Sequence, residues 1–160
     1  MSAVRKTKTL DGLLAAAYAS AMDVMSTTEA QKVVRGTLFH GTRHPTVILD
    51  KGFASSIGGE FGPGIYLTNF EPTAEFYALH VAQGPEKPSV IRCRASIVRP
   101  FVIKKTDWIR LTTKATPRTI QRHIIDSGYD GIIGLGLTGQ PQIVAFVPSQ
   151  VTGVSARAVQ

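Results

Sequence analysis

The side chains that could do chemistry fall in three short segments of the sequence. The segments are FHGT at 39–42, FGPGIYLT at 61–68 and QIVAFVPSQV at 142–151. They carry an imidazole, a phenol and a carboxamide, those of His40, Tyr66 and Gln142. Between the first segment and the end of the second lie five glycines, at positions 52, 58, 59, 62 and 64. This density of glycine indicates backbone that closely approaches another group, as in a binding loop.

The spacing of other residues excludes several classes of site. Cys93 is the single cysteine, so no intramolecular disulfide can form, and no Cys and His residues have the spacing of a structural zinc site. We therefore expect no metal. Neither G-x-G-x-x-G nor a Walker A sequence is present. Their absence argues against a Rossmann domain and a P-loop NTPase.

The elements that must position the three segments mix helices with short strands. Apolar residues recur at steps of three and four between Leu10 and Met25, and Ser26 precedes Glu29 by three residues as in a capping box. The sequence predicts helices over 9–25, 26–34, 72–81 and from Pro117 to 125, with Asn69 capping the third. It predicts strands over 37–40, 65–68, 89–98 and 142–147, and a short apolar run at 132–133. This order without regular strand–helix–strand alternation favours an α+β fold.

Length and composition favour one compact domain. The chain has 160 residues, of which 43% are hydrophobic and 18% charged. A chain of this length buries roughly 70% of the surface that its unfolded form exposes, enough for a core with a cleft. We expect a single domain over 1–160, with a helical N-terminal portion over 1–35 and a core over 37–151, and we expect a monomer.

The three segments, in this order and spacing, resemble the ADP-ribosyltransferase superfamily. The resemblance is to the branch with a His-Tyr-Glu triad, shared by diphtheria-type toxins and poly(ADP-ribose) polymerases. It spans 38–151 and is closest where ILDKGF at 48–53 leads into FGPGIYLT. A second tyrosine, Tyr77, follows Tyr66 by eleven residues, a spacing similar to the family's. The resemblance implies a split β-sandwich of two small sheets with flanking helices and a cleft for NAD.

The same resemblance implies a role for each matching residue. Tyr66 and Tyr77 would hold the flat, cationic nicotinamide ring by stacking, with a cation–π contribution of about 0.5–2 kcal/mol. The peptide of Gly41, unhindered by a side chain, would bind the nicotinamide carboxamide, with the Thr42 hydroxyl as a third contact. His40 would hydrogen-bond a hydroxyl of the adenosine ribose. NAD is then a co-substrate, and no metal takes part.

The third triad position departs from the family pattern. The family has Glu where this chain has Gln142, and Gln140, two residues earlier, supplies no carboxylate either. A neutral amide can orient the ribose but offers no full negative charge to a cationic transition state. Loss of one preorganised contact of this kind costs about 10²–10³ in rate. Transfer of a single ADP-ribose therefore remains plausible, whereas elongation to a polymer does not.

Three functions are compatible with these residues. The leading hypothesis is a mono-ADP-ribosyltransferase, such as a toxin or effector, that releases nicotinamide and modifies a macromolecule, with His40, Tyr66 and Gln142 as catalytic residues. The second is a module that binds NAD or ADP-ribose and has lost catalysis through Gln142. The third is a NAD glycohydrolase, in which water is the acceptor. His44, His80 and His123 are expected to be structural or surface residues. Glu60 is either a loop carboxylate near the cleft or, as favoured on a glycine-rich loop, a solvated carboxylate.

The positive charge is concentrated in one stretch. The net charge is +7, and residues 92–122 contain nine Lys and Arg residues against Asp107 alone. The stretch either recruits an acidic protein or a nucleic acid as acceptor, or is a solvated strand and loop that keeps the protein soluble. Trp108 is its single aromatic residue, which argues against base stacking on single strands.

The N-terminal residues resemble a targeting segment only weakly. Basic Arg5, Lys6 and Lys8 precede the apolar run 13–19, but Asp11 and Gly12 interrupt the pattern. We expect neither a cleaved signal peptide nor a membrane span, which would require about 20 apolar residues. The protein is then expected to be cytoplasmic or delivered into a target cell.

Overall fold

The computed structural model describes residues 9–136 and 140–160, and these form an α+β fold. The predicted fold class is thereby confirmed. The helices are α1 (Leu10–Met22), α2 (Thr27–Arg35), α3 (Pro45–Lys51), α4 (Glu71–His80), α5 (Lys105–Leu111) and α6 (Pro117–Asp126). The strands are β1 (Leu38–Thr42), β2 (Ile65–Thr68), β3 (Ser89–Ala95), β4 (Pro100–Lys104), β5 (Gly131–Leu135), β6 (Pro141–Ala145) and β7 (Val151–Ala158).

The strands are joined into one seven-stranded sheet in the order β4-β5-β6-β2-β1-β3-β7. Strands β4 and β5 run parallel, and all other neighbours run antiparallel. Between β2 and β1 a single residue pair, Phe39 opposite Thr68, makes the connection. The expectation of two small sheets is corrected in this respect: a first half-sheet (β4-β5-β6-β2) and a second half-sheet (β1-β3-β7) meet at that pair.

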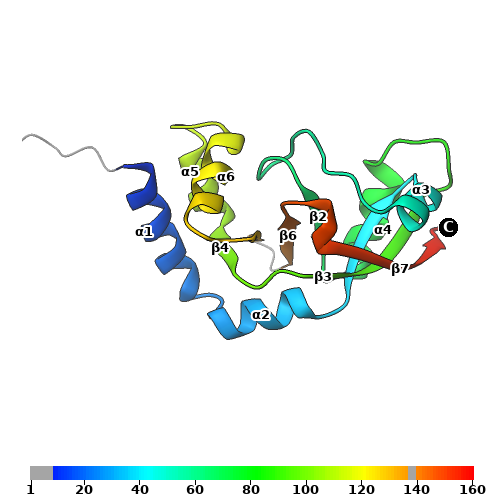
Figure 1. Cartoon of the computed structure of the whole chain (residues 1–160), viewed down its shortest axis with the longest axis horizontal. Coiled ribbons are helices and arrows are strands. Elements are labelled where there is room, and N and C mark those ends of the chain that lie inside the picture. Colours follow the sequence, from blue (N-terminus) through cyan, green and yellow to red (C-terminus); the bar gives the residue numbers. More distant parts are fainter. Residues whose placement is uncertain (1–8, 137–139) are drawn as a thin grey trace, which may run out of the picture.

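Two groups of buried side chains lie on opposite faces of the sheet. One extends along both half-sheets beneath α2 and includes Val34, Leu38, Ile91 and Ile143. The other lies between the first half-sheet and α1, α5 and α6 and includes Trp108. Figure 1 shows α1, α5 and α6 at one end of the long axis, and α3 and α4 at the other. The sheet therefore links two ends that carry different helices.

Most predicted helix starts are confirmed by their caps. The Thr9 side chain accepts from the Gly12 N–H, and Ser26 and Glu29 form a capping box at α2. The expected cap at Asn69 is wrong, because α4 begins at Glu71 and its N-cap residue, Phe70, has no side-chain cap. The Thr68 hydroxyl instead accepts from the Phe70 N–H at 3.1 Å and turns the chain into the helix.

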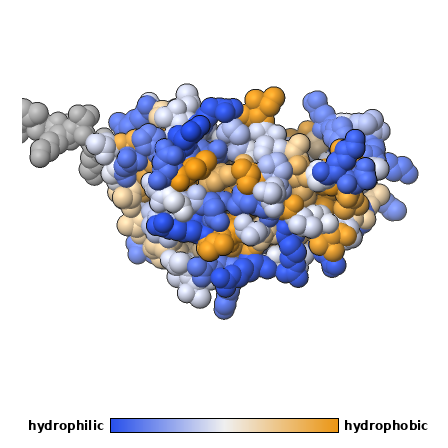
Figure 2. Space-filling model, in the orientation of Figure 1, coloured by the Kyte–Doolittle hydropathy of each residue, from blue (hydrophilic) through white to orange (hydrophobic). Residues whose placement is uncertain are grey.

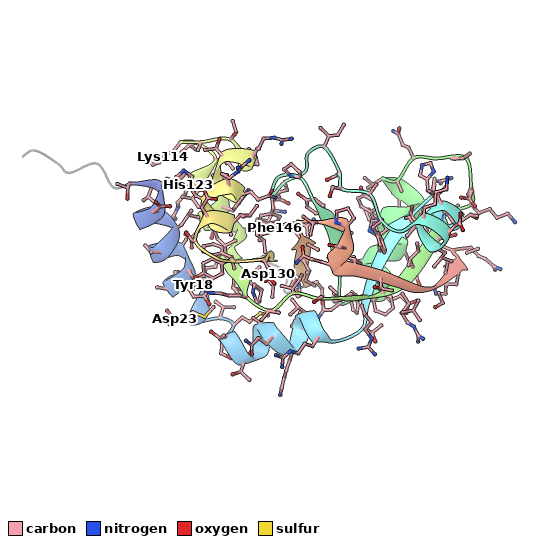
Figure 3. All side chains as sticks on the ribbon, viewed as in Figure 1. Tyr18, Asp23, Lys114, His123, Asp130 and Phe146 are labelled. Carbon is pink, nitrogen blue, oxygen red and sulfur yellow. The ribbon has the colours of Figure 1, made fainter. Side chains whose placement is uncertain are left out.

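Two predicted strands end earlier than the apolar pattern indicates. Strand β3 stops at Ala95, because the Asp130 carboxylate takes the backbone N–H groups of Val98 and Arg99 at 2.9 and 2.7 Å. Asp130 is labelled in Figure 3 near the middle of the molecule. Similarly, β6 ends at Ala145, since the Gln150 side chain accepts from the next two N–H groups. Partly exposed polar side chains thus accept hydrogen bonds from the backbone beyond both strand ends.

Four elements were not predicted: α3, β4, α5 and β7. Strand β7 has the sequence VTGVSARA, and its small side chains are mostly exposed, so it lacks an apolar alternation. Helices α3 and α5 each have seven residues and no side-chain cap. Short helices without caps leave little periodic signal for a sequence pattern to reveal.

The apolar run near the N-terminus folds into α1. Its residues Leu14 and Ala17 are buried against the sheet, and Tyr18 packs on the Phe101 and Tyr129 rings, at centroid distances of 5.3 and 5.5 Å. Tyr18 is labelled in Figure 3 on the lower turn of this helix. Residues Arg5, Lys6 and Lys8 lie outside the described residues. Within 9–136 and 140–160, no helix has the length and apolarity needed to cross a membrane.

Candidate functional site

A cleft of about 550 Å³ lies where the two half-sheets diverge. Of the six residues predicted to bind NAD or act in catalysis, five line it: His40, Gly41, Tyr66, Tyr77 and Gln142. They come from β1, β2, α4 and β6, so segments as far apart in the sequence as His40 and Gln142 meet in one cavity. Gln140 lines the cleft as well.

Strand register places the Tyr66 and Gln142 side chains on the same face of the sheet. Thr68 lies opposite Gln142 in the antiparallel pair of β2 and β6, and Tyr66 is two residues before Thr68. Because alternate residues of a strand share a face, Tyr66, Thr68 and Gln142 point to one side. The ring and the carboxamide therefore border the same space.

His40 links the half-sheets with its side chain. Its Nδ1 lies 2.8 Å from the Tyr66 carbonyl oxygen, and its ring packs edge-on against Phe53 at 5.2 Å. A carbonyl only accepts, so Nδ1 carries the proton and Nε2 keeps a lone pair. Burial lowers the pKa of His40, which the bond to Tyr66 opposes only in part. The neutral imidazole can thus accept a hydrogen bond from a ligand hydroxyl.

The lowered pKa of His40 predicts that its protonation destabilises the fold. In the unfolded chain His40 titrates near 6.5, and in the folded protein it titrates lower. Below that pH the unfolded state binds the proton more readily, so the free energy of unfolding falls as the pH drops from about 6.5 towards the folded pKa. We expect His40→Asn, whose amide can still donate to Tyr66, to lose less stability than wild type between pH 7.5 and 5.5. Urea denaturation at both pH values measures this, and equal losses would contradict it.

The Tyr66 hydroxyl anchors the glycine-rich loop. It donates to the Gly62 carbonyl at 2.5 Å and accepts from the Phe61 N–H at 3.0 Å. Burial, together with the nearby Glu60 charge, raises the pKa of Tyr66 to about 12 despite the Phe61 N–H, so the phenol keeps its proton at neutral pH. A Cβ added at Gly59 would lie 2.4–2.8 Å from the Tyr66 ring and hydroxyl. Glycine is therefore required where this loop lies on the ring.

Gly41 is explained by the helix that packs on it. A Cβ there would lie 2.2 Å from the Ala74 carbonyl oxygen and 2.9 Å from the Ala78 nitrogen. The missing side chain thus lets α4 lie directly on β1, and α4 carries Tyr77, 47% exposed, to the cleft. Thr42 does not line the cleft. It is buried, and its hydroxyl accepts from the His44 N–H at 3.0 Å, so the expected third contact with a carboxamide is not prepared in this structure.

Helices α5 and α6 hold the cleft loop, which we define as residues 54–64. The Gln121 amide donates to the Phe61 and Pro63 carbonyls at 3.0 and 2.7 Å, and Gln121 is buried. The Trp108 indole donates to the Glu60 carbonyl at 2.8 Å, and Arg118 donates to the Ile57 carbonyl at 3.1 Å. Sequence analysis missed these anchors. A Gln on the buried face of α6 was the available signal.

The position of Glu60 agrees with the less favoured of its two alternatives, a loop carboxylate near the cleft. It lines the cleft, and its Oε1 pairs with the Lys105 ammonium at 3.2 Å. About a third of its side chain is exposed. Among the described residues that line the cleft, Glu60 is the single carboxylate.

The fold is shared with a chain of known structure. Over 95% of this chain and 94% of that one, it superposes with a TM-score of 0.53 and 10% sequence identity on a chain of the crystal structure of the M. tuberculosis MbcT–MbcA toxin–antitoxin complex. At this identity the similarity shows the fold alone. No known protein family and no curated protein matches the sequence.

The remaining histidines lie away from the cleft. His123 Nδ1 contacts Asp11 Oδ1 at 2.8 Å and links α6 to α1, and His123 is labelled in Figure 3. His80 packs on Phe76 at 4.6 Å, and His44 lies beside Gly84. All three therefore have structural or surface positions, as predicted. Within the described ranges, no group of His, Cys, Asp or Glu side chains could hold a metal.

The basic stretch 92–122 is divided among several elements. Arg92 and Arg94 lie on β3, whereas the cations from Lys105 onwards lie on or beside α5 and α6. Several are engaged within the protein: Arg99 lies 4.3 Å over the Tyr129 ring, and Lys104 donates to Ser20. On the face that Figure 2 shows, hydrophilic residues are interspersed with separate apolar groups. The basic residues of the stretch are therefore divided between β3, β4 and the helices α5 and α6, with some engaged inside the protein.

Proposed function

We propose that this protein is a mono-ADP-ribosyltransferase that uses NAD as co-substrate. The observation that carries the proposal is the cleft between the half-sheets, because it gathers His40, Gly41, Tyr66, Tyr77 and Gln142. These are the residues that the sequence resemblance assigns to NAD. A volume of about 550 Å³ lies within the usual range for small-molecule sites.

Each residue has chemistry suited to a part of the dinucleotide. His40 Nε2 accepts from a ribose hydroxyl, because Nδ1 is committed to the Tyr66 carbonyl. The Tyr66 and Tyr77 rings take the nicotinamide. Gln142 accepts from a hydroxyl of the nicotinamide ribose and orients that sugar. In the reaction, the bond between nicotinamide N1 and ribose C1′ breaks, and its electron pair leaves with the ring. The acceptor's nucleophile then forms a bond to C1′ and releases its proton to solvent.

A second candidate function follows from Gln142. A carboxamide provides no negative charge beside the developing cation, so a module that binds NAD or ADP-ribose without turnover is the main alternative.

The experiment that separates these functions mixes the purified protein with NAD and follows free nicotinamide. Release that requires a cell lysate supports the transferase, steady release without a macromolecule supports a glycohydrolase, and binding without release supports the module. Labelled NAD, with protein and nucleic acid fractions counted separately, identifies the class of acceptor.

We expect Gln142→Glu to keep or raise the rate of nicotinamide release, by up to about tenfold, because a carboxylate adds charge stabilisation to the same hydrogen-bond acceptor. Initial rates at saturating NAD measure the effect. Gln140→Glu, also at the cleft but outside the predicted triad, is the matched control. If Gln142→Glu bound NAD normally but released no nicotinamide, this account of the charge would be wrong.

The shared fold supports a role as toxin or effector. The neighbouring structure is described as part of a toxin–antitoxin complex. By extension, we propose that this protein acts on a macromolecule of its target cell and is held in check by a protein partner.

A further inference from the structure

We infer that Glu60 is the carboxylate of this site and stabilises the positive charge that Gln142 cannot. The inference rests on the proposed function, because it concerns the same cleft. It assigns a charge-stabilising role to a residue outside the predicted triad of His40, Tyr66 and Gln142. The cleft needs such a group, since loss of nicotinamide leaves a cation on the ribose.

The first argument is the position of Glu60. It lines the cleft with Tyr66 and Gln142, and it is the single Asp or Glu among the described lining residues. No Lys or Arg lines the cleft within the same part of the chain. The Lys105 ammonium, which pairs with Glu60 Oε1, belongs to a residue that is not among those lining the cleft. Glu60 is therefore the charged residue that a cation in the cleft would meet among the described lining residues.

The second argument is that Glu60 is held in place from three sides. Its carbonyl accepts from the Trp108 indole at 2.8 Å, and its carboxylate pairs with Lys105 at 3.2 Å. The next residue, Phe61, donates its N–H to Tyr66 and packs on Trp108 at 4.8 Å. A charged group that is fixed before the reaction needs no reorganisation as charge develops, and this makes it effective.

The third argument is that the carboxylate already acts on its neighbour in the cleft. The Glu60 charge contributes to the raised pKa of Tyr66, the residue whose ring is assigned to nicotinamide. A negative charge that opposes ionisation of that phenol favours a nearby cation by the same Coulomb interaction. Lys105 engages one carboxylate oxygen, Oε1.

The test compares Glu60→Gln with two other variants. We expect Glu60→Gln to lower kcat for nicotinamide release by about 10²–10³-fold with a much smaller change in KM, because the charge matters most in the transition state. Lys105→Met keeps the carboxylate. We expect it to lower kcat at most about fivefold, which corresponds to the energy of an exposed ion pair. Glu86→Gln removes the same charge from a residue outside the cleft and should match wild type.

A binding measurement gives a second readout that does not require turnover. Wild type should prefer NAD, with its cationic ring, over reduced NAD, with its neutral ring, and Glu60→Gln should reduce this preference severalfold. If Glu60→Gln retains wild-type kcat and preference, or if Lys105→Met loses as much as Glu60→Gln, the inference is overturned while the proposed function stands. If wild type binds no NAD, the proposed function fails and the inference fails with it.

Discussion

Replacing Gly41 with alanine is expected to lower the free energy of unfolding by about 1–3 kcal/mol and to weaken NAD binding at least tenfold. The added Cβ would lie 2.2 Å from the Ala74 carbonyl oxygen, and that atom belongs to the backbone of α4. No side-chain rotation can relieve this contact, so the whole helix must shift. Tyr77 and Thr73 shift with it, and both line the cleft.

Gly36→Ala is the matched control for this prediction. A Cβ at Gly36 would lie 3.5 Å from the nearest carbonyl oxygens, which is an ordinary contact, and its φ of −74° suits alanine. Denaturant unfolding and calorimetric titration with NAD measure both effects. If Gly41→Ala has the same stability and NAD affinity as Gly36→Ala, the packing of α4 on β1 does not depend on the absence of a side chain at position 41.

Tyr66→Ala is expected to weaken NAD binding at least tenfold, by removing both an aromatic face and the anchor of the cleft loop. The phenol hydroxyl satisfies the Phe61 N–H and donates to the Gly62 carbonyl. Unchanged affinity in a titration would count decisively against the assignment of NAD to this cleft.

Tyr66→Phe separates the two contributions. It keeps the ring but leaves the Phe61 N–H without its partner, which costs about 1–3 kcal/mol of stability. We expect this variant to unfold at lower denaturant concentration and to retain more NAD affinity than Tyr66→Ala. Equal affinities of the two variants would assign the binding energy to the loop anchor instead of the ring.

The strands that carry His40 and Tyr66 were predicted because they are encoded locally. Strand β2 coincides with the predicted 65–68, and β1 contains His40 because apolar residues and glycine bound a short extended segment. Because the three segments resemble those of the ADP-ribosyltransferase superfamily, the sequence analysis could also predict that they meet in one cleft. The reason for Gly41 was not predicted: its lack of a side chain accommodates Ala74, 33 residues later in the chain.

The rest of the site depends on contacts between residues far apart in the sequence. Gln121 reaches the Phe61 carbonyl across 60 positions, and Trp108 reaches the Glu60 carbonyl across 48. A backbone carbonyl has no sequence signature, so neither partnership could be predicted from residue types. The choice between the two alternatives for Glu60 could not be made from the sequence for the same reason, because Trp108 and Lys105 of α5 supply its surroundings.

The single residue pair between the half-sheets has a mechanical consequence. Phe39 opposite Thr68 and the His40 link to Tyr66 are the bonds that hold β1 to β2, whereas each half-sheet has its own complete ladder. Widening this junction therefore breaks fewer backbone pairings than separating any other two neighbouring strands of the sheet. A dinucleotide bound along this junction would contact both half-sheets at once and would therefore stabilise their relative position.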